Sequence, residues 1–176
     1  ITVTDGGAGD SNSAAGVITF IGAVGAFNIN VTTGATSPAT LGLGAVMDLN
    51  SFNTSSAAGT LTVTFQNTGL ISPIGTNFFN SAIGGTTNTA SLSYNLGVNG
   101  SSILSGGPLS GAFAQTSQGT ATTASPYTMT MVTTLVASGT SNSSYNWQVS
   151  VPEPSAMLLL GSGLLGLVAW MRRRKD

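Results

Sequence analysis

Apolar and polar residues alternate one by one through much of this chain, and that two-residue period limits the folds open to it. Leu61, Val63 and Phe65, for example, are separated by single threonines. Successive side chains of a β-strand point to opposite faces, so this pattern is typical of antiparallel strands with one buried face. Comparable alternation or short β-branched runs occur over residues 1–4, 16–21, 27–32, 41–49, 92–98, 127–136 and 145–151.

Clusters of Gly, Ser, Asn and Pro separate these segments and are typical of turns. The clusters cover residues 5–15, 34–40, 51–59, 84–85 and 138–144. Before Ala156 no stretch shows a helical period of useful length. About eight to ten short strands at this spacing predict an all-β domain over residues 1–150, an antiparallel β-sandwich of the jelly-roll or immunoglobulin-like type.

The end of the chain follows a different pattern. Residues 156–171 form an uncharged apolar run with six leucines, and all four basic residues of the protein follow it. A helix over this run would span roughly 24 Å, which is short for a bilayer core of about 30 Å. Because basic residues stay on the cytoplasmic side, we expect a marginal C-terminal membrane helix with the preceding domain outside. The alternative is a buried core helix, although such a helix usually has a polar face.

A short motif precedes the apolar run, and a basic tail ends the chain. The motif is Val151, Pro152, Glu153 and Pro154. The tail consists of Arg172, Arg173, Arg174 and Lys175, which we expect to act as stop-transfer charges. Over residues 151–176 this three-part arrangement resembles the PEP-CTERM sorting signal of exported Gram-negative bacterial proteins.

The resemblance implies several properties of the protein. It implies recognition by an exosortase, a membrane-embedded cysteine protease, with cleavage near the Pro-Glu-Pro motif. It also implies transient anchoring in the inner membrane and a final location at the cell surface or in the extracellular matrix of a biofilm. The C-terminal helix would then be a targeting signal and not part of the folded domain.

Charged residues are scarce, at 5% of the chain against about 25% in an ordinary soluble domain. Before Pro152 the charged side chains are those of Asp5, Asp10 and Asp48, and no Lys or Arg occurs there. Nucleic acid is therefore excluded as a partner of this part, because phosphate groups need cationic side chains. The chain also begins at Ile1, which fits removal of an N-terminal export signal.

The side chains that most often carry catalysis are missing. The chain has no Cys and no His, which excludes disulfides, thiol chemistry and zinc sites of the usual kind. Two Asp carboxylates can in principle serve a glycosidase. Asp5, Asp10 and Asp48, however, lie in or near Gly- and Asn-rich segments, where Asp commonly supports turns. We therefore expect no enzyme activity, no catalytic residues and no cofactor.

One loop offers oxygen ligands for a cation. The segment from Asp5 to Asp10, with Asn12 nearby, is rich in Gly and could surround Ca²⁺. No Glu closes this loop, and its spacing matches no EF-hand. An ordinary Gly-rich turn is the preferred interpretation, so we expect no metal site.

Two functions remain for an exported, nearly uncharged β-sandwich. The first is a non-enzymatic structural protein of the cell surface or extracellular matrix. The second is a module that binds exopolysaccharide through exposed aromatic rings. The candidate rings are those of Tyr94, Tyr127, Tyr145 and Trp147. All of them fall on the apolar phase of their strands, which favours core packing, and we therefore expect the structural role.

The expected sheets lack the charges that natural proteins often place on edge strands to prevent strand addition. Residues 1–5 form an extended segment before a linker of Gly, Ser and Asn, so they could pair with the edge of a neighbouring copy. We expect such pairing to produce a homopolymer, either a fibre or a sheet of identical subunits.

Overall fold

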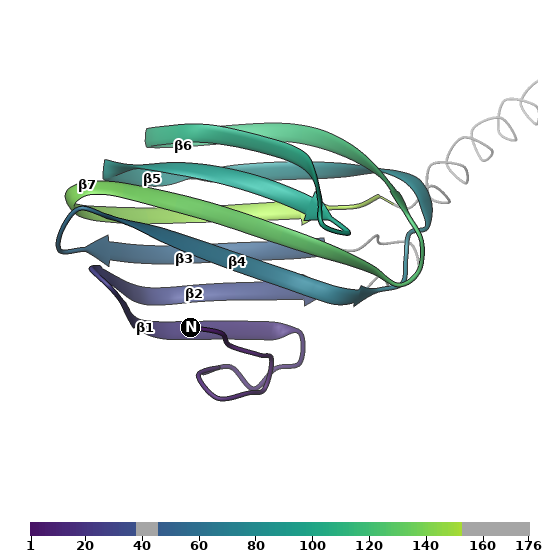
Figure 1. Cartoon of the computed structure of the whole chain (residues 1–176), viewed down its shortest axis with the longest axis horizontal. Coiled ribbons are helices and arrows are strands. Elements are labelled where there is room, and N and C mark those ends of the chain that lie inside the picture. The colour runs from purple at the N-terminus through teal and green to yellow at the C-terminus, as the bar shows by residue number, and fades with distance from the viewer. Residues whose placement is uncertain (38–45, 153–176) are drawn as a thin grey trace, which may run out of the picture.

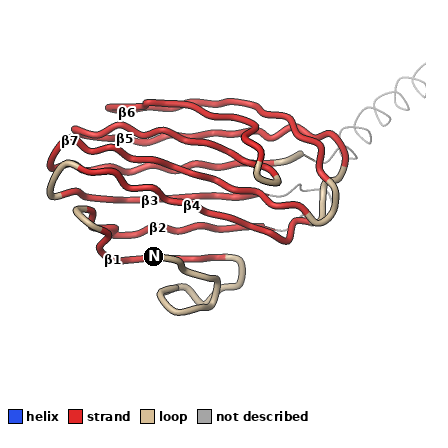
Figure 2. Tube along the Cα trace, viewed as in Figure 1, coloured by secondary structure: helices blue, strands red, loops and turns tan. Residues whose placement is uncertain are grey.

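The computed structural model describes residues 1–37 and 46–152, and antiparallel strands account for most of them (Figures 1 and 2). The strands are β1 (Val17–Val24), β2 (Phe27–Ser37), β3 (Val46–Ser55), β4 (Gly59–Leu70), β5 (Gly75–Val98), β6 (Ser101–Thr123) and β7 (Tyr127–Ser150). These residues contain no helix. The prediction of an all-β antiparallel fold is confirmed.

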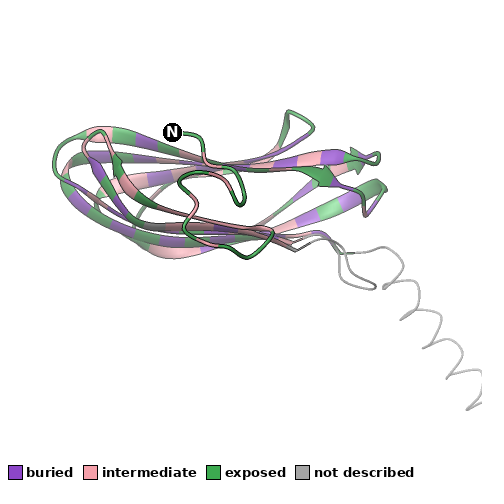
Figure 3. Ribbon diagram, turned by 90° about the horizontal axis from the view of Figure 1, so that it is seen from below, coloured by how far each residue is buried: buried purple, intermediate pink, exposed green. Residues whose placement is uncertain are grey.

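Three strands are long enough to run through both layers of a sandwich, since β5 and β7 have 24 residues each and β6 has 23. The β5–β7 register shifts between Asn88 and Ala90, and Thr89 between them has a φ of 53°. Thr89 Oγ1 donates to the Thr140 carbonyl oxygen at 2.6 Å, and Ser138 Oγ donates to the Thr89 carbonyl oxygen at 3.0 Å. These bonds hold the two strands together where they turn, and the layers join at this end (Figure 3).

The turn divides the long strands between two layers. Layer A consists of β1, β2, β3, residues 142–150 of β7, residues 75–88 of β5 and residues 111–123 of β6, in that order. Layer B consists of β4, residues 127–137 of β7, residues 90–98 of β5 and residues 101–109 of β6. Strand β6 is therefore an edge of both layers, whereas β1 and β4 form separate edges on the opposite side.

The hydrophobic core lies between the layers and uses alternate residues of each strand (Figure 3). Met47 of layer A and Met131 of layer B are fully buried there. The Trp147 ring of layer A packs edge-to-face against the Tyr94 ring of layer B, with centroids 5.2 Å apart. The Trp147 indole N–H also donates to Ser81 Oγ at 2.8 Å, so the one polar atom of this large ring has a buried partner.

The strands are fewer and longer than the sequence predicted. The expected breaks at residues 84–85 and 138–144 lie inside β5 and β7, and β6 was not among the expected strands. Residues 1–4, expected as a strand, have no strand structure. The polar residues Ser55 and Ser141 face the interior, where their hydroxyl oxygens lie 2.8 Å apart. Small polar side chains thus satisfy one another near the end where the layers join.

Candidate functional site

A polar hollow of about 490 Å³ lies on the outer face of layer A, within the size range of about 300–1,000 Å³ found for ligand pockets. Its centre is Ala82 of β5, which pairs with Gln148 of β7 on one side and with Thr116 of β6 on the other. The short Ala82 side chain between two longer ones leaves the surface recessed. We call this surface the amide hollow. Its lining residues are Asn80, Ser81, Ala82, Thr116, Ser117, Gln118, Gln148 and Ser150.

Three primary amides border the amide hollow, those of Asn80, Gln118 and Gln148. Gln118 Nε2 donates to Asn80 Oδ1 at 2.7 Å, which orients both side chains. Each amide offers donors and an acceptor, and no lining residue is charged. The arrangement can therefore form hydrogen bonds with an uncharged ligand that is rich in hydroxyl or amide groups.

Asp48 lies on the same outer face, which corrects its expected position in or near a turn. It is a residue of β3, paired with Gln148 of β7. Partial burial raises the pKa of the Asp48 carboxyl, and a hydrogen bond with the Asn146 side chain opposes that shift. Among the described residues no group of three or more acidic, His or Cys side chains is placed to hold a metal ion.

The carboxylates of the N-terminal loop serve the loop itself. Asp10 Oδ1 accepts from the backbone N–H groups of Thr19 and Asn12, each at 2.9 Å. These bonds hold the pKa of Asp10 below its ordinary value. Asp5 Oδ2 accepts from the backbone N–H of Gly16 at 2.7 Å. Both side chains therefore stabilise the turn and attach it to the edge of β1, as the preferred interpretation of this Gly-rich segment expects.

The four aromatic side chains considered for polysaccharide binding are buried, each at most 3% exposed, so their core role is confirmed. They are Tyr94, Tyr127, Tyr145 and Trp147. Two other rings emerge on the outer face of layer A: Phe52 of β3 is 40% exposed and Phe78 of β5 is 57% exposed. The sequence could have predicted the exposure of Phe78, because Phe78 and Phe79 are adjacent and only one of two neighbours in a strand can face the core.

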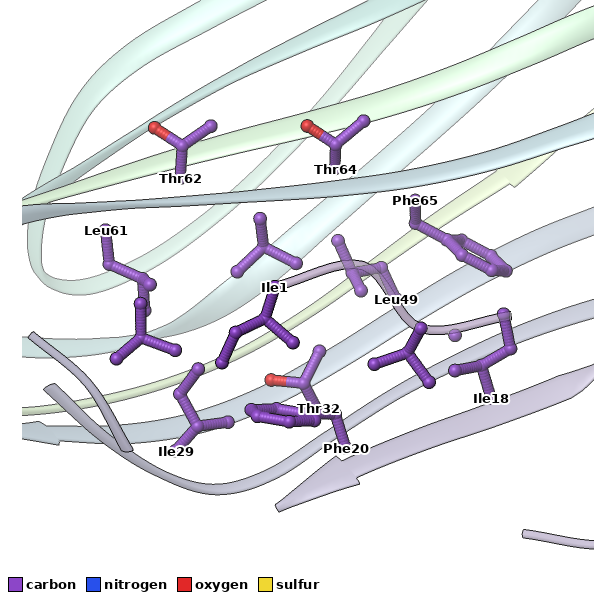
Figure 4. A pocket seen from close by; sticks show the side chains of 14 residues that line it. Ile1, Ile18, Phe20, Ile29, Thr32, Leu49, Leu61, Thr62, Thr64 and Phe65 are labelled. Atoms are coloured by element: carbon purple, nitrogen blue, oxygen red, sulfur yellow. The ribbon is translucent and has the colours of Figure 1, made fainter. Parts of the chain in front are cut away.

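An apolar pocket of about 180 Å³ lies on the side of β1 and β4, and the first residues of the chain line it (Figure 4). Ile1 and Val3 line it together with side chains such as Phe20 of β1 and Phe65 of β4, and Ile1 is 84% exposed. The loop that follows is bonded to β1, since the Ser11 N–H donates to the Thr19 carbonyl oxygen at 2.9 Å. Asp10 and Ser11 of this loop thus cover part of the β1 edge.

The other side of the sandwich ends in β6, which pairs with β5 alone. Its second side therefore carries backbone groups that pair with no strand in the described part of the chain. None of its 23 residues is charged. Pro108 and Gly107 lie where β6 passes from layer B to layer A, so residues 112–123 form an edge uninterrupted by Pro.

The body of the protein ends directly before the Pro-Glu-Pro motif. Val151 is 1% exposed and belongs to the core, although the sequence assigned it to the sorting signal, and Pro152 is exposed. Glu153, Pro154, the apolar run at 156–171 and the basic tail at 172–175 lie outside the described residues. Within residues 1–37 and 46–152 no helix is long and apolar enough to cross a membrane.

A family model, the PEP-CTERM protein-sorting motif, matches residues 150–174. The chain therefore carries this sorting motif, as expected from its last residues. The motif indicates an exported protein that is anchored transiently in the membrane and processed by an exosortase. No curated protein matches the chain in sequence.

Several solved structures are distantly similar to this chain. Dimeric latent PorU from Porphyromonas gingivalis matches with 15% identity and a TM-score of 0.33, over 56% of this chain and 10% of PorU. The PA14 sugar-binding domain from an RTX adhesin matches with 17% identity and a TM-score of 0.26, over 60% of this chain and 46% of that domain. TmCBM61 in complex with β-1,4-galactotriose matches with 6% identity and a TM-score of 0.31, over 78% of this chain and 83% of its own. Scores this low carry no conclusion about function.

Proposed function

We propose that this protein is a non-enzymatic structural component of the cell surface or extracellular matrix of a Gram-negative bacterium, and that copies of it associate along β6. The observation that carries the proposal is the uncharged edge of residues 112–123 of β6, which pairs on one side only and contains neither Pro nor a register shift. Natural sheets usually protect such an edge with charged side chains, a bulge or a covering loop. The sorting motif supports the proposal, because it indicates an exported protein.

The geometry favours β6 over β1 as the associating edge, because the N-terminal loop is hydrogen-bonded to β1. Residues 112–123 of two copies can pair antiparallel about a two-fold axis, which would extend layer A from one copy into the next. Such a contact is closed and gives a dimer. Growth into a fibre needs a second contact. It would form if residues 1–5 of each copy entered the pocket beside β1 and β4 of a neighbouring copy.

The absence of enzyme activity is part of the proposal. Its support is the position of the carboxylates that precede the sorting motif. Asp5 and Asp10 accept hydrogen bonds from the backbone of the N-terminal loop and of β1, whereas Asp48 lies in β3. The aromatic rings first considered for polysaccharide binding are buried, so a binding role would need another surface.

Charge placed on the β6 edge tests the association. The test variant carries Ala112→Lys and Ala114→Lys, both exposed residues of β6. The control carries Asn142→Lys and Ser144→Lys on β7, in the interior of layer A. Ser144 and Ala112 pair with the same residue, Thr86, from opposite sides. Test and control variants therefore carry the same number of added lysines on the same face of layer A. Sedimentation and electron microscopy of the full chain should show fibres for wild type and control, whereas the edge variant should form nothing larger than the dimer that exchange of residues 1–5 allows.

Deletion of residues 1–5 distinguishes the contribution of the exchange contact from that of the β6 contact. We expect it to shorten or abolish fibres while the β6 dimer persists. The apolar C-terminal run is present in every variant, so association driven by that run would survive the β6 lysines. A monomeric wild type, or equal loss of assembly in the edge variant and the β7 control, contradicts the proposal.

A further inference from the structure

Phe78 stands at the end of the amide hollow and is the most exposed aromatic ring among the large apolar side chains described. It lies two residues before Asn80 in β5, and alternate residues of a strand share one face. Its partner across the strand pair is Thr120 of β6, two residues beyond Gln118. The ring and the amides of Asn80 and Gln118 therefore lie side by side on the outer face of layer A.

A single exposed Phe is ordinary, but an apolar ring beside a set of uncharged amides has a definite chemical match. A sugar ring presents apolar C–H groups on its faces and hydroxyl groups around its rim. Aromatic rings pack against the apolar faces, and primary amides donate to and accept from hydroxyl groups. The same combination fits a nucleic acid poorly, because no cation lines the hollow.

We propose that Phe78 and the amide hollow form a binding site for a neutral polysaccharide. Phe78 packs against the face of one sugar unit, while Asn80, Gln118 and Gln148 bind hydroxyl groups of the adjoining unit. The recess above Ala82 gives this second unit room between β6 and β7. The partner is neutral, because the hollow offers no cation to a uronate or sulfate group and the Asp48 carboxyl lies beside Gln148.

Isothermal titration of the full chain in mild detergent tests this site. The neutral probes are dextran, mixed-linkage β-glucan, galactan and mannan, and the anionic probes are alginate and dextran sulfate. We expect at least one neutral polymer to bind. Phe78→Ala and Gln148→Ala should each weaken that binding by about tenfold, the usual effect of removing a central contact. Phe78→Trp should retain it, because a larger ring can still stack.

Phe52 provides the matched control, since it is an exposed Phe on the same face whose partner on β7 is Ser144, four residues before Gln148. Phe52→Ala should leave the dissociation constant unchanged, and the melting temperatures of both alanine variants should match that of the wild type. The site is refuted if no neutral probe binds the wild type. Equal weakening by Phe52→Ala and Phe78→Ala, or tighter binding of the anionic probes, refutes it as well. None of these results depends on self-association through β6.

Discussion

Gly84 and Gly85 are neighbours in β5, yet their surroundings differ. A Cβ atom on Gly85 would overlap the Ser144 carbonyl oxygen and lie 2.7 Å from the Tyr145 Cα. A Cβ atom on Gly84 would meet only the Phe113 carbonyl oxygen, at an ordinary 3.6 Å. Gly85 therefore allows β7 to approach β5 closely beside the buried Tyr145 side chain.

At this residue scale we predict opposite outcomes for two alanine substitutions. Gly85→Ala should lower the free energy of unfolding by about 1–3 kcal/mol, because the backbone of β7 must move away. Gly84→Ala should leave it unchanged or raise it by about 0.5 kcal/mol, since Ala restricts the unfolded chain. Urea unfolding followed by circular dichroism measures both. Equal stability of the two variants would show that β7 does not pack against Gly85 as described.

At the scale of the strands, a buried polar row crosses β3, β7 and β5. Asn53 pairs with Ser143, and Ser143 pairs with Thr87. Asn53 Oδ1, Ser143 Oγ and Thr87 Oγ1 have no hydrogen-bond partner within the described part of the chain. Thr133 of the same β7 strand differs, because its hydroxyl lies 2.7 Å from the buried Tyr145 hydroxyl.

This contrast predicts opposite effects of the same Thr-to-Val change. Thr87→Val should stabilise the protein by about 1 kcal/mol, because it replaces an unpaired buried hydroxyl with a methyl group of similar size. Thr133→Val should destabilise it by about 1 kcal/mol, because the Tyr145 hydroxyl loses a partner. Thermal unfolding of both variants checks the pair. A loss of stability in Thr87→Val would mean that its hydroxyl is satisfied in solution.

At the scale of the whole molecule, the described residues contain few groups that titrate. Burial raises the pKa of Tyr127 to about 12 and also raises that of Tyr145. An Asp carboxyl ordinarily has a pKa of about 3.9, so the lowered pKa of Asp10 and the raised pKa of Asp48 affect stability in acid. Stability should therefore change little between about pH 6 and 9, or on addition of salt.

Alkaline pH should unfold the protein through its buried tyrosines. The pKa of Tyr127 is higher in the folded state than its ordinary value of about 10, so above that pH the unfolded state releases its proton first. The stability is present below about pH 10 and is lost as the pH rises toward 12. Urea unfolding from pH 7 upward measures this loss. Tyr127→Phe should reduce the slope above pH 10, although it removes the bond from Tyr127 Oη to the Ser72 carbonyl oxygen. If the pH dependence of stability above pH 10 were the same in Tyr127→Phe as in the wild type, Tyr127 would not cause the alkaline loss of stability.

Local pattern was enough to predict the fold class and much of the core. Alternation placed Tyr94, Tyr145 and Trp147 on buried positions, and all three are buried. It did so because a strand exposes its two faces to different surroundings whatever its neighbours are. The sorting motif was equally readable, since it is a local pattern within residues 150–174 that can be recognised without knowing the fold.

Only the tertiary structure decided where the strands turn and which surface is open. Residues 84–85 resemble a turn in sequence, yet they continue as a strand because β5 pairs with β7 there. Residues 138–141 lie where β7 passes from one layer to the other without leaving the strand. Ala82 becomes the floor of a hollow only through its pairing with Gln148 and Thr116, which are distant in sequence. Phe78 likewise becomes a surface residue only once Phe79 occupies the core. Contacts between distant strands set these features, and a pattern of near neighbours does not encode such contacts.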